Sequence, residues 1–241
     1  MIQNAISVVI PMHNEEKNVR PLLDELFHFL INNFSDFEII IINDASSDGT
    51  LSELKLYNST QAITIINNDK NCGQGYSVIT GCLAAKFSLI VTMDGDMQVN
   101  PTDILKLYKH REMYKLDFVA SRRKINQNDG AFSHIPSLLG NILIRAIYKV
   151  DLIDVGSSLK LFPTKEVVNI PKFKNVHRYI SIFLHYKGLK YEEVEVTSRV
   201  RFTGKSKYSG LKFIRAFVEI IFLRIQLSKI VSPKLNSAQV D

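Results

Sequence analysis

The sequence predicts an α/β fold in which helices cover both faces of a doubly wound, mostly parallel sheet. Apolar, strand-like runs alternate with segments of helical periodicity through residues 6–121, and this alternation is typical of βαβ units. The runs at 37–43 and 88–94 are almost continuously apolar rather than alternating, as expected for strands buried on both faces. Ligands of such sheets bind beyond the carboxyl ends of the strands, so the loops that follow strands should carry the function.

The expected elements follow from periodicity and turn signals in chain order. We expect strands at 6–11, 37–43, 62–67, 88–94, 117–121, 159–162 and 191–198, and helices at 14–30, 51–57, 75–86, 103–114, 136–150 and 208–230. In the first helix, apolar residues recur at helical spacing at Val19, Leu22, Leu23, Leu26 and Leu30. The polar stretch 122–133 is expected to be a loop.

The chain of 241 residues is long enough to bury a full core, and it shows no internal repeat or linker. We expect one domain at 1–207, followed by an amphipathic helix and tail at 208–241. No stretch is long and apolar enough for a spanning helix, and no secretory signal is recognisable. The expected location is therefore the cytosolic side of a membrane.

Charge is unevenly distributed along the chain. Residues 1–159 hold 14 Lys and Arg against 18 Asp and Glu, whereas residues 160–241 hold 16 against 6. A basic C-terminal third attracts nucleic acid, anionic lipid or phosphorylated ligands. Because basic residues are not interleaved with aromatic ones and no helix-turn-helix pattern is present, the sequence argues against nucleic acid.

The strongest local signal for chemistry is Asp94-Gly95-Asp96, at the end of a predicted strand and followed by Gln98. Two carboxylates at this spacing can converge on one hard cation, and the amide of Gln98 adds a neutral oxygen. Oxygen ligands without His or Cys favour Mg²⁺ or Mn²⁺ over zinc. The alternative is a solvated acidic turn.

Two other loops follow strands. Asp44 is placed to accept hydrogen bonds from a nucleobase or ribose, while Ser46, Ser47 and Asp48 are expected to cap the next helix. The loop after the first strand lacks a Gly-x-Gly-x-x-Gly turn, which argues against a dehydrogenase. Glu15, in that loop, is also favourable at a helix start, because its negative charge interacts with the positive end of the helix macrodipole.

A cationic segment surrounds Gly204, with Arg199, Arg201, Lys205 and Lys207. Such a segment suits a phosphate, because Arg offers bidentate contacts and Lys a point charge. The alternative is a solvated basic face.

Six motifs in this order resemble a family 2 glycosyltransferase of the GT-A fold, in the group of dolichyl-phosphate mannose synthase and bacterial polyprenyl-phosphate glycosyltransferases. They begin at Ser7, Ile42, Asn71, Met93, Ser121 and Gly204, and read SVVIPMHNEE, INDASSDGT, NCGQG, MDGDMQ, SR and GKSKY. The segments that begin at Asp154 and His177, DVGSSLK and HRY, look like a bacterial branch that acts on undecaprenyl phosphate.

The resemblance implies roles for particular residues. It implies that the nucleotide is held by Pro11, His13, Glu15 and Asp44, and the metal and donor diphosphate by Asp94, Asp96 and Gln98. It further implies that phosphates of donor or acceptor meet Arg122, Arg201 and Lys205. The chain departs from the usual pattern at His13, where Tyr is usual, and at Asn43-Asp44, where Asp-Asp is usual.

The resemblance also implies the reaction: transfer from a UDP- or GDP-linked sugar to a polyprenyl phosphate, with inversion to a β-linked product. A lipid phosphate is already an anionic nucleophile, so no strong general base is needed. The implied location is peripheral, on the cytoplasmic face of a bacterial membrane, with the C-terminal helix on the anionic surface. The alternative for this helix is a place in the core or in a dimer interface. Two alternatives stay open: a transferase acting on a hydroxyl acceptor, with Glu192 or Glu193 as base, and a non-catalytic membrane-surface module.

Overall fold

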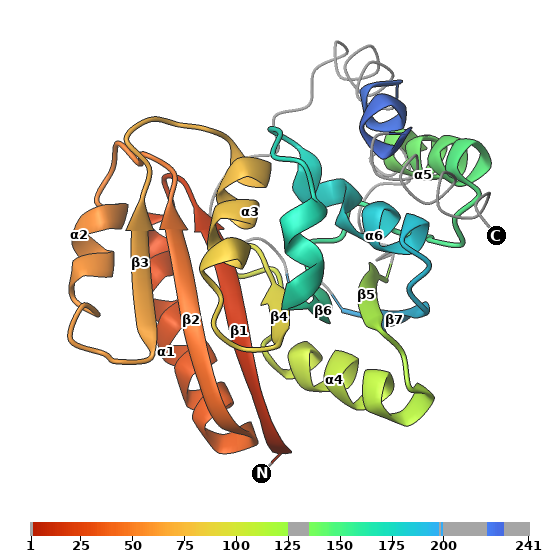
Figure 1. Ribbon diagram of the computed structural model, residues 1–241. Helices are drawn as coiled ribbons and strands as arrows, with labels where there is room; N and C mark the ends of the chain where they lie inside the picture. The colour runs from red at the N-terminus through yellow and green to blue at the C-terminus, as the bar shows by residue number, and fades with distance from the viewer. Residues whose placement is uncertain (1, 125–134, 198, 200–220, 229–241) are drawn as a thin grey trace, which may run out of the picture.

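The computed structural model describes residues 2–124, 135–197, 199 and 221–228, and its core is one seven-stranded mixed sheet (Figure 1). The strand order is β3-β2-β1-β4-β6-β5-β7. The strands are β1 Ile2–Met12, β2 Phe34–Asn43, β3 Ile63–Asn67, β4 Leu89–Thr92, β5 Phe118–Arg123, β6 Lys160–Pro163 and β7 Tyr191–Val196. The helices are α1 Glu16–Asn33, α2 Thr50–Lys55, α3 Gln74–Ala84, α4 Thr102–Tyr114, α5 Ile135–Tyr148, a 3₁₀ helix η1 Thr164–Asn169, and α6 Val176–Tyr186.

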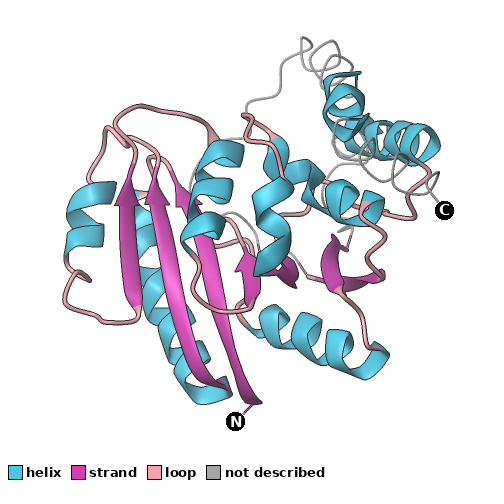
Figure 2. Cartoon of the chain, viewed as in Figure 1, coloured by secondary structure: helices cyan, strands magenta, loops and turns pink. Residues whose placement is uncertain are grey.

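The first half of the sheet is parallel. β1 pairs with both β2 and β4 in parallel register, and β2 pairs with β3 in the same sense. Figure 2 shows the long arrows of β1, β2 and β3 ending at one edge. The isoleucines of β2 are fully buried on both faces, which confirms the expected doubly wound α/β fold and explains the continuous apolar runs.

The second half contains β6, the one strand among the described strands that runs antiparallel to its neighbours. β6 runs antiparallel between β4 and β5, and β5 pairs in parallel with β7. β6 therefore starts at the edge where β4 ends, and its first residue, Lys160, lies opposite Thr92. This arrangement brings residues far apart in the sequence to the loop that holds Asp94 and Asp96.

Helices cover both faces of the sheet. Apolar side chains of α1, α2 and α4 pack with one face, and those of α3, α5 and α6 pack with the other. In α1 the core residues are the ones that periodicity predicts: Val19, Leu22, Leu23, Leu26 and Leu30 are all fully buried. The amphipathic pattern thus fixes which side of α1 faces the sheet.

Two regions differ from the expectation. No helix is expected between β6 and β7, yet η1 and α6 lie there. Val176, Ile180, Phe183 and Leu184 do recur at helical spacing and are fully buried in α6. The second difference is that β5 extends through Arg123, so Arg122 is in a strand and not in the expected loop.

The predicted C-terminal helix is described only at 221–228, where it is helical; the rest of 208–230 lies outside the described residues. Leu223 and Leu227 are buried in the core, whereas Ile221 and Ile225 are about half exposed, at 51% and 52%. The segment therefore has one apolar side packed on the domain and another facing outward. Among the described residues, no helix combines the length and apolar character that crossing a bilayer requires.

The start of α3 packs against the segment before α6 through a glycine. Gly75 N donates to Lys174 O at 2.8 Å, and a Cβ at Gly75 would lie 2.6 Å from main-chain atoms of Phe173, Lys174 and Val176. Because these main-chain atoms cannot shift without a large cost in energy, only glycine fits at position 75.

We predict that Gly75→Ala lowers the free energy of unfolding by about 1–3 kcal/mol, because the added methyl overpacks this junction. Gly140→Ala is the matched control, since nothing lies within 4 Å of its notional Cβ in α5. Urea denaturation of both variants measures the difference. Equal stability of Gly75→Ala and the wild type would contradict this packing.

Candidate active site

A pocket of about 350 Å³ opens at the carboxyl ends of β1, β2 and β4, beside the first turn of α3. Six of the residues that the sequence analysis assigns to the site line it: Pro11, His13, Glu15, Asp44, Asp94 and Asp96. The remaining lining residues are Met12, Asn71, Gly73, Gln74 and Gly95. The pocket therefore lies where a doubly wound sheet is expected to bind ligands.

The loops after β1 and β2 brace each other. Asn14 N donates to Ser46 Oγ at 3.0 Å and Ser47 N donates to Asn14 Oδ1 at 2.8 Å. Asp48 Oδ1 accepts from Thr50 N at 3.0 Å, but the N-cap of α2 is Gly49 and no side chain caps this helix. The Ser46–Asp48 segment therefore joins the two loops, and the expectation that it caps the next helix is wrong.

One end of the pocket is built around Asp44. Its carboxylate accepts from Asn68 Nδ2 at 2.7 Å, Cys72 N at 2.9 Å and Gly73 N at 2.8 Å. Burial alone would favour the neutral acid, but these hydrogen bonds outweigh it and hold the pKa of Asp44 below its ordinary value. His13 Nδ1–H donates to Asp44 O at 2.9 Å, which fixes the ring at the rim. Asp44 therefore holds the 71–73 loop in place as a charged acceptor.

The other end of the pocket holds the two carboxylates after β4. Asp94 Oδ1 accepts from Gln74 Nε2 at 2.5 Å, and Asp96 Oδ1 accepts from Gln98 N at 3.2 Å. Burial, and then the charge of Asp96, raises the pKa of Asp94 to about 6. The donor hydroxyl of Ser158 and the charge of Lys160 offset part of this rise. Two acidic groups thus share one buried edge.

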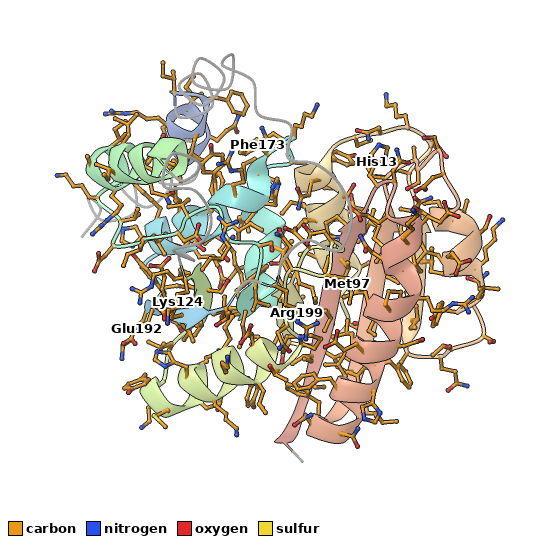
Figure 3. All side chains as sticks on the ribbon, turned by 180° about the vertical axis from the view of Figure 1, so that it is seen from behind. His13, Met97, Lys124, Phe173, Glu192 and Arg199 are labelled. Carbon is orange, nitrogen blue, oxygen red and sulfur yellow. The ribbon has the colours of Figure 1, made fainter. Side chains whose placement is uncertain are left out.

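This donor set fits a divalent cation. Carboxylate oxygens from Asp94 and Asp96, where the charge of Asp96 disfavours the ionisation of Asp94, match the hard oxygen ligands of Mg²⁺ and Mn²⁺. Asp96 is 8% exposed, so the pair faces a site of limited hydration. Gln98 is adjacent, and its main-chain O accepts from Arg199 N at 2.9 Å. In Figure 3, Met97 of this loop lies next to Arg199.

A buried cation stands behind the acidic pair. Lys160 lies at the start of β6 and is 1% exposed. Its ammonium donates a hydrogen bond to Ser157 O. Burial lowers the pKa of Lys160 to about 8, against the opposing influence of the Asp154 and Asp94 charges. Burial, with the charges of Lys160 and Arg178, also lowers the pKa of His177 to about 3, so this histidine is neutral at pH 7.

The two arginines at the end of β5 lie differently. Arg122 Nη2 is 3.3 Å from Glu195 Oε2 on β7. Arg123 instead bonds Asp154 with two nitrogens, and its charge interacts with those of Asp94 and Asp96. The structure thus does not bring Arg122 into the pocket, and Arg201 and Lys205 lie outside the described residues.

Sequence reasoning missed several residues of the site. Asn68 donates to Asp44 and Gln74 donates to Asp94, and Lys160 and Arg123 supply positive charge near Asp94. A lysine inside an otherwise apolar strand, Leu159-Lys160-Leu161, was a readable signal for Lys160. No comparable local signal marks Asn68 or Gln74, because their roles depend on tertiary contacts.

Solved structures share this fold at low sequence identity. Mannosyl-3-phosphoglycerate synthase from Rubrobacter xylanophilus is 15% identical with a TM-score of 0.71, over 94% of this chain and 75% of that one. Glucosyl-3-phosphoglycerate synthase from Mycobacterium tuberculosis, solved with Mn²⁺, UDP-glucose and phosphoglyceric acid, is 14% identical with a TM-score of 0.67, over 95% and 80%. The fold is therefore that of GT-A glycosyltransferases.

The sequence defines the family more closely. The pattern of glycosyl transferase family 2 matches residues 7–165, and the chain belongs to that family. Dodecaprenyl-phosphate galacturonate synthase of Rhizobium johnstonii is 32% identical over 221 residues, covering 90% of this chain and 65% of the relative. Undecaprenyl-phosphate 4-deoxy-4-formamido-L-arabinose transferase of Proteus mirabilis is 29% identical over 221 residues, covering 90% and 67%. The chain thus spans about two thirds of the length of these relatives.

We predict that Asp44→Asn lowers the free energy of unfolding at pH 7 by about 1–3 kcal/mol, because an amide nitrogen cannot accept from the main chain. A carboxyl whose pKa falls on folding stabilises the fold above its unfolded value, about 3.9, and loses this contribution as pH falls through the folded value. The difference between wild type and variant should therefore shrink below about pH 4.

Urea denaturation at several pH values measures this difference. Asp36→Asn is the control, since Asp36 is exposed and its carboxylate accepts from the adjacent Phe37 N; its effect should stay within about 0.5 kcal/mol. A difference for Asp44→Asn that stays constant from pH 7 to pH 3 would show that ionised Asp44 does not hold the loop.

Proposed function

We propose that this chain transfers a sugar, with inversion, from a nucleoside diphosphate sugar to a polyprenyl phosphate. The observation that carries the proposal is the pocket with Asp44 at one end and the Asp94–Asp96 pair at the other. A nucleoside diphosphate would lie in this pocket with its base near Asp44 and its phosphates near the pair. The names of the two relatives, both polyprenyl-phosphate sugar enzymes, support the acceptor class.

Mg²⁺ or Mn²⁺ would be held by Asp94 and Asp96, with Gln98 as the third candidate ligand. The ion would neutralise charge on the departing diphosphate. Pro11, His13 and Glu15 would position the nucleoside on the β1 side of the pocket. A structure of the same fold was solved with Mn²⁺ and UDP-glucose, which supports a divalent cation and a nucleotide sugar as ligands.

The arrangement of carboxylates favours a phosphate acceptor over a hydroxyl. A hydroxyl acceptor needs a general base, and the two candidates, Glu192 and Glu193, are engaged elsewhere. Glu192 Oε2 is 2.7 Å from His110 Nε2, and Glu193 accepts from the main-chain nitrogens of Ile153 and Asp154 at 2.6 and 3.0 Å. A lipid phosphate is ionised near pH 7 and attacks without a base.

An outward apolar patch suits contact with a membrane surface. It is formed by exposed residues of α5 and of 221–228, namely Ile142, Leu143, Ile221, Phe222 and Ile225. Arg145 and Arg224 lie on the same two segments, which share one core cluster through Ile144 and Leu223. Apolar side chains flanked by cations favour an anionic lipid surface. We infer a peripheral location on the cytoplasmic face of a bacterial membrane.

We predict that the purified chain, with Mg²⁺ or Mn²⁺ and a panel of UDP- and GDP-sugars, releases nucleoside diphosphate only when undecaprenyl phosphate is present. Asp96→Asn should lower this release roughly 100-fold or more, because the charge on the leaving diphosphate loses its metal. Release is measured by a coupled phosphatase assay, and the product should be β-linked.

Glu53→Gln is the control for this assay, since Glu53 pairs with Arg20 on the surface, away from the pocket. Full release without lipid would move the assignment to a soluble acceptor or to hydrolysis. An α-linked product would exclude a single displacement.

We predict that Ile221→Asp and Ile225→Asp each weaken binding to vesicles with about 30% anionic lipid at least fivefold, because a charge replaces apolar contact in the interface. Vesicle flotation measures binding, and circular dichroism checks that folding is retained. Leu56→Asp is the matched control, since Leu56 is 61% exposed near α2 and outside the patch. Unchanged vesicle binding of both patch variants would rule out this surface.

A further inference from the structure

One wall of the pocket is in contact with the segment that precedes α6. Gly73 lines the pocket and has a left-handed backbone, with φ of 89°. A Cβ at this position would lie 2.7 Å from Cγ and 3.3 Å from Cε of Lys174. The aliphatic stem of Lys174 therefore occupies the space that a side chain at position 73 would fill.

Lys174 is held in this position through its main chain. Its carbonyl oxygen accepts from Gly75 N at 2.8 Å, in the first turn of α3. The ring centroid of the preceding residue, Phe173, lies 5.4 Å from that of Phe222, in an edge-to-face contact. In Figure 3, Phe173 lies at the same end of the domain as His13 of the pocket. A hydrogen bond and an aromatic contact thus anchor the segment from which the Lys174 stem extends.

Gly73 lies between the two ends of the pocket. Its N–H donates to Asp44 Oδ2 at 2.8 Å. The next residue, Gln74, donates through Nε2 to Asp94 Oδ1 at 2.5 Å. Position 73 therefore marks the middle of the pocket, where a bound nucleoside diphosphate would pass from its ribose to its phosphates.

The ammonium of Lys174 is within reach of this middle part. Nζ is one bond of about 1.5 Å beyond Cε, so it lies within about 5 Å of the position that a Cβ of Gly73 would take. Lys174 is exposed, and no carboxylate among the described residues forms an ion pair with it. The nearby Lys172 instead lies over the ring of Tyr76, 5.3 Å from its centroid. Lys174 is therefore an available cation at the edge of the pocket.

We propose that the Lys174 ammonium binds the diphosphate of the nucleoside diphosphate donor; this inference rests on the proposed function. A lysine ammonium is a point charge with three N–H donors on a flexible stem, so it can follow a phosphate oxygen without a fixed geometry. It would add a protein cation to the charge that the metal supplies on the leaving group. Lys174 is a binding residue for the donor, and it takes no part in proton transfer.

The direct test is equilibrium binding of UDP and of GDP to the full chain at saturating Mn²⁺, compared with binding of uridine and guanosine. Lys174→Met keeps an unbranched stem over Gly73 and removes the charge. It should raise the dissociation constant of the nucleoside diphosphate roughly 5- to 20-fold, because a charge-assisted contact with a phosphate is lost at an exposed site. The dissociation constant of the nucleoside should change less than about twofold.

Further variants isolate the charge at position 174. Lys174→Arg keeps the cation and should retain most of the affinity for the nucleoside diphosphate. Lys172→Met is the matched control, since it removes the same charge from the same segment, and it should leave the dissociation constant within about twofold of the wild type. The effect of Lys174→Met should shrink in about 0.5 M NaCl, because salt screens an exposed charge. Circular dichroism checks folding, and Lys174→Gln replaces Lys174→Met if that variant does not fold.

An unchanged dissociation constant in Lys174→Met, or an equal loss of affinity in Lys172→Met, would overturn the proposal. A parallel loss of nucleoside affinity would show that Lys174 supports the 71–73 loop and not the phosphates, and would overturn it as well. If UDP or GDP binding depends on Lys174 but the wild type transfers no sugar to undecaprenyl phosphate, only the proposed function is rejected. Absence of nucleoside diphosphate binding to the wild type would overturn both.

Discussion

The central constraint in this molecule is that two carboxylates share the buried end of one strand. Asp94 and Asp96 follow β4, and burial together with the charge of Asp96 raises the pKa of Asp94 to about 6. A fold that keeps such a pair ionised must supply positive charge nearby. Lys160 and Arg123 supply part of it from β6 and β5, and a divalent cation would supply the rest. The negative charge of Asp154 interacts favourably with both cations, so Asp154, Lys160, Arg123 and the acidic pair form one group of interacting charges.

The topology explains how so many loops meet there. The parallel half of the sheet ends β1, β2 and β4 at one edge, and the antiparallel β6 starts at that edge with Lys160 opposite Thr92. Each of the three loops contains a non-glycine residue with left-handed backbone: Asn14, Ala45 and Met97, with φ of 58°, 52° and 65°. This backbone conformation is unfavourable for residues other than glycine, and it persists only where surrounding contacts stabilise it. The cross-bracing of Asn14 with Ser46 and Ser47 is one such set of contacts.

Much of this could be predicted from the sequence, because it depends on local pattern. The helical spacing of Val19, Leu22 and Leu26 predicted α1 and its buried side, and the apolar runs predicted parallel strands whose following loops meet. Six predicted site residues share one pocket as a result. The remainder depends on tertiary structure. Neither α6 nor the direction of β6 was predicted, and only the paired strands show that Arg123, not Arg122, lies on the side of Asp94.

The most direct test of this account is anomalous diffraction from crystals of the chain soaked with Mn²⁺ and UDP. We expect one strong Mn²⁺ peak bound by Asp94 and Asp96, with the diphosphate on the ion and the base between Pro11 and Asp44. A Mn²⁺ ion or a nucleotide bound elsewhere, with this pair left uncoordinated, would contradict it.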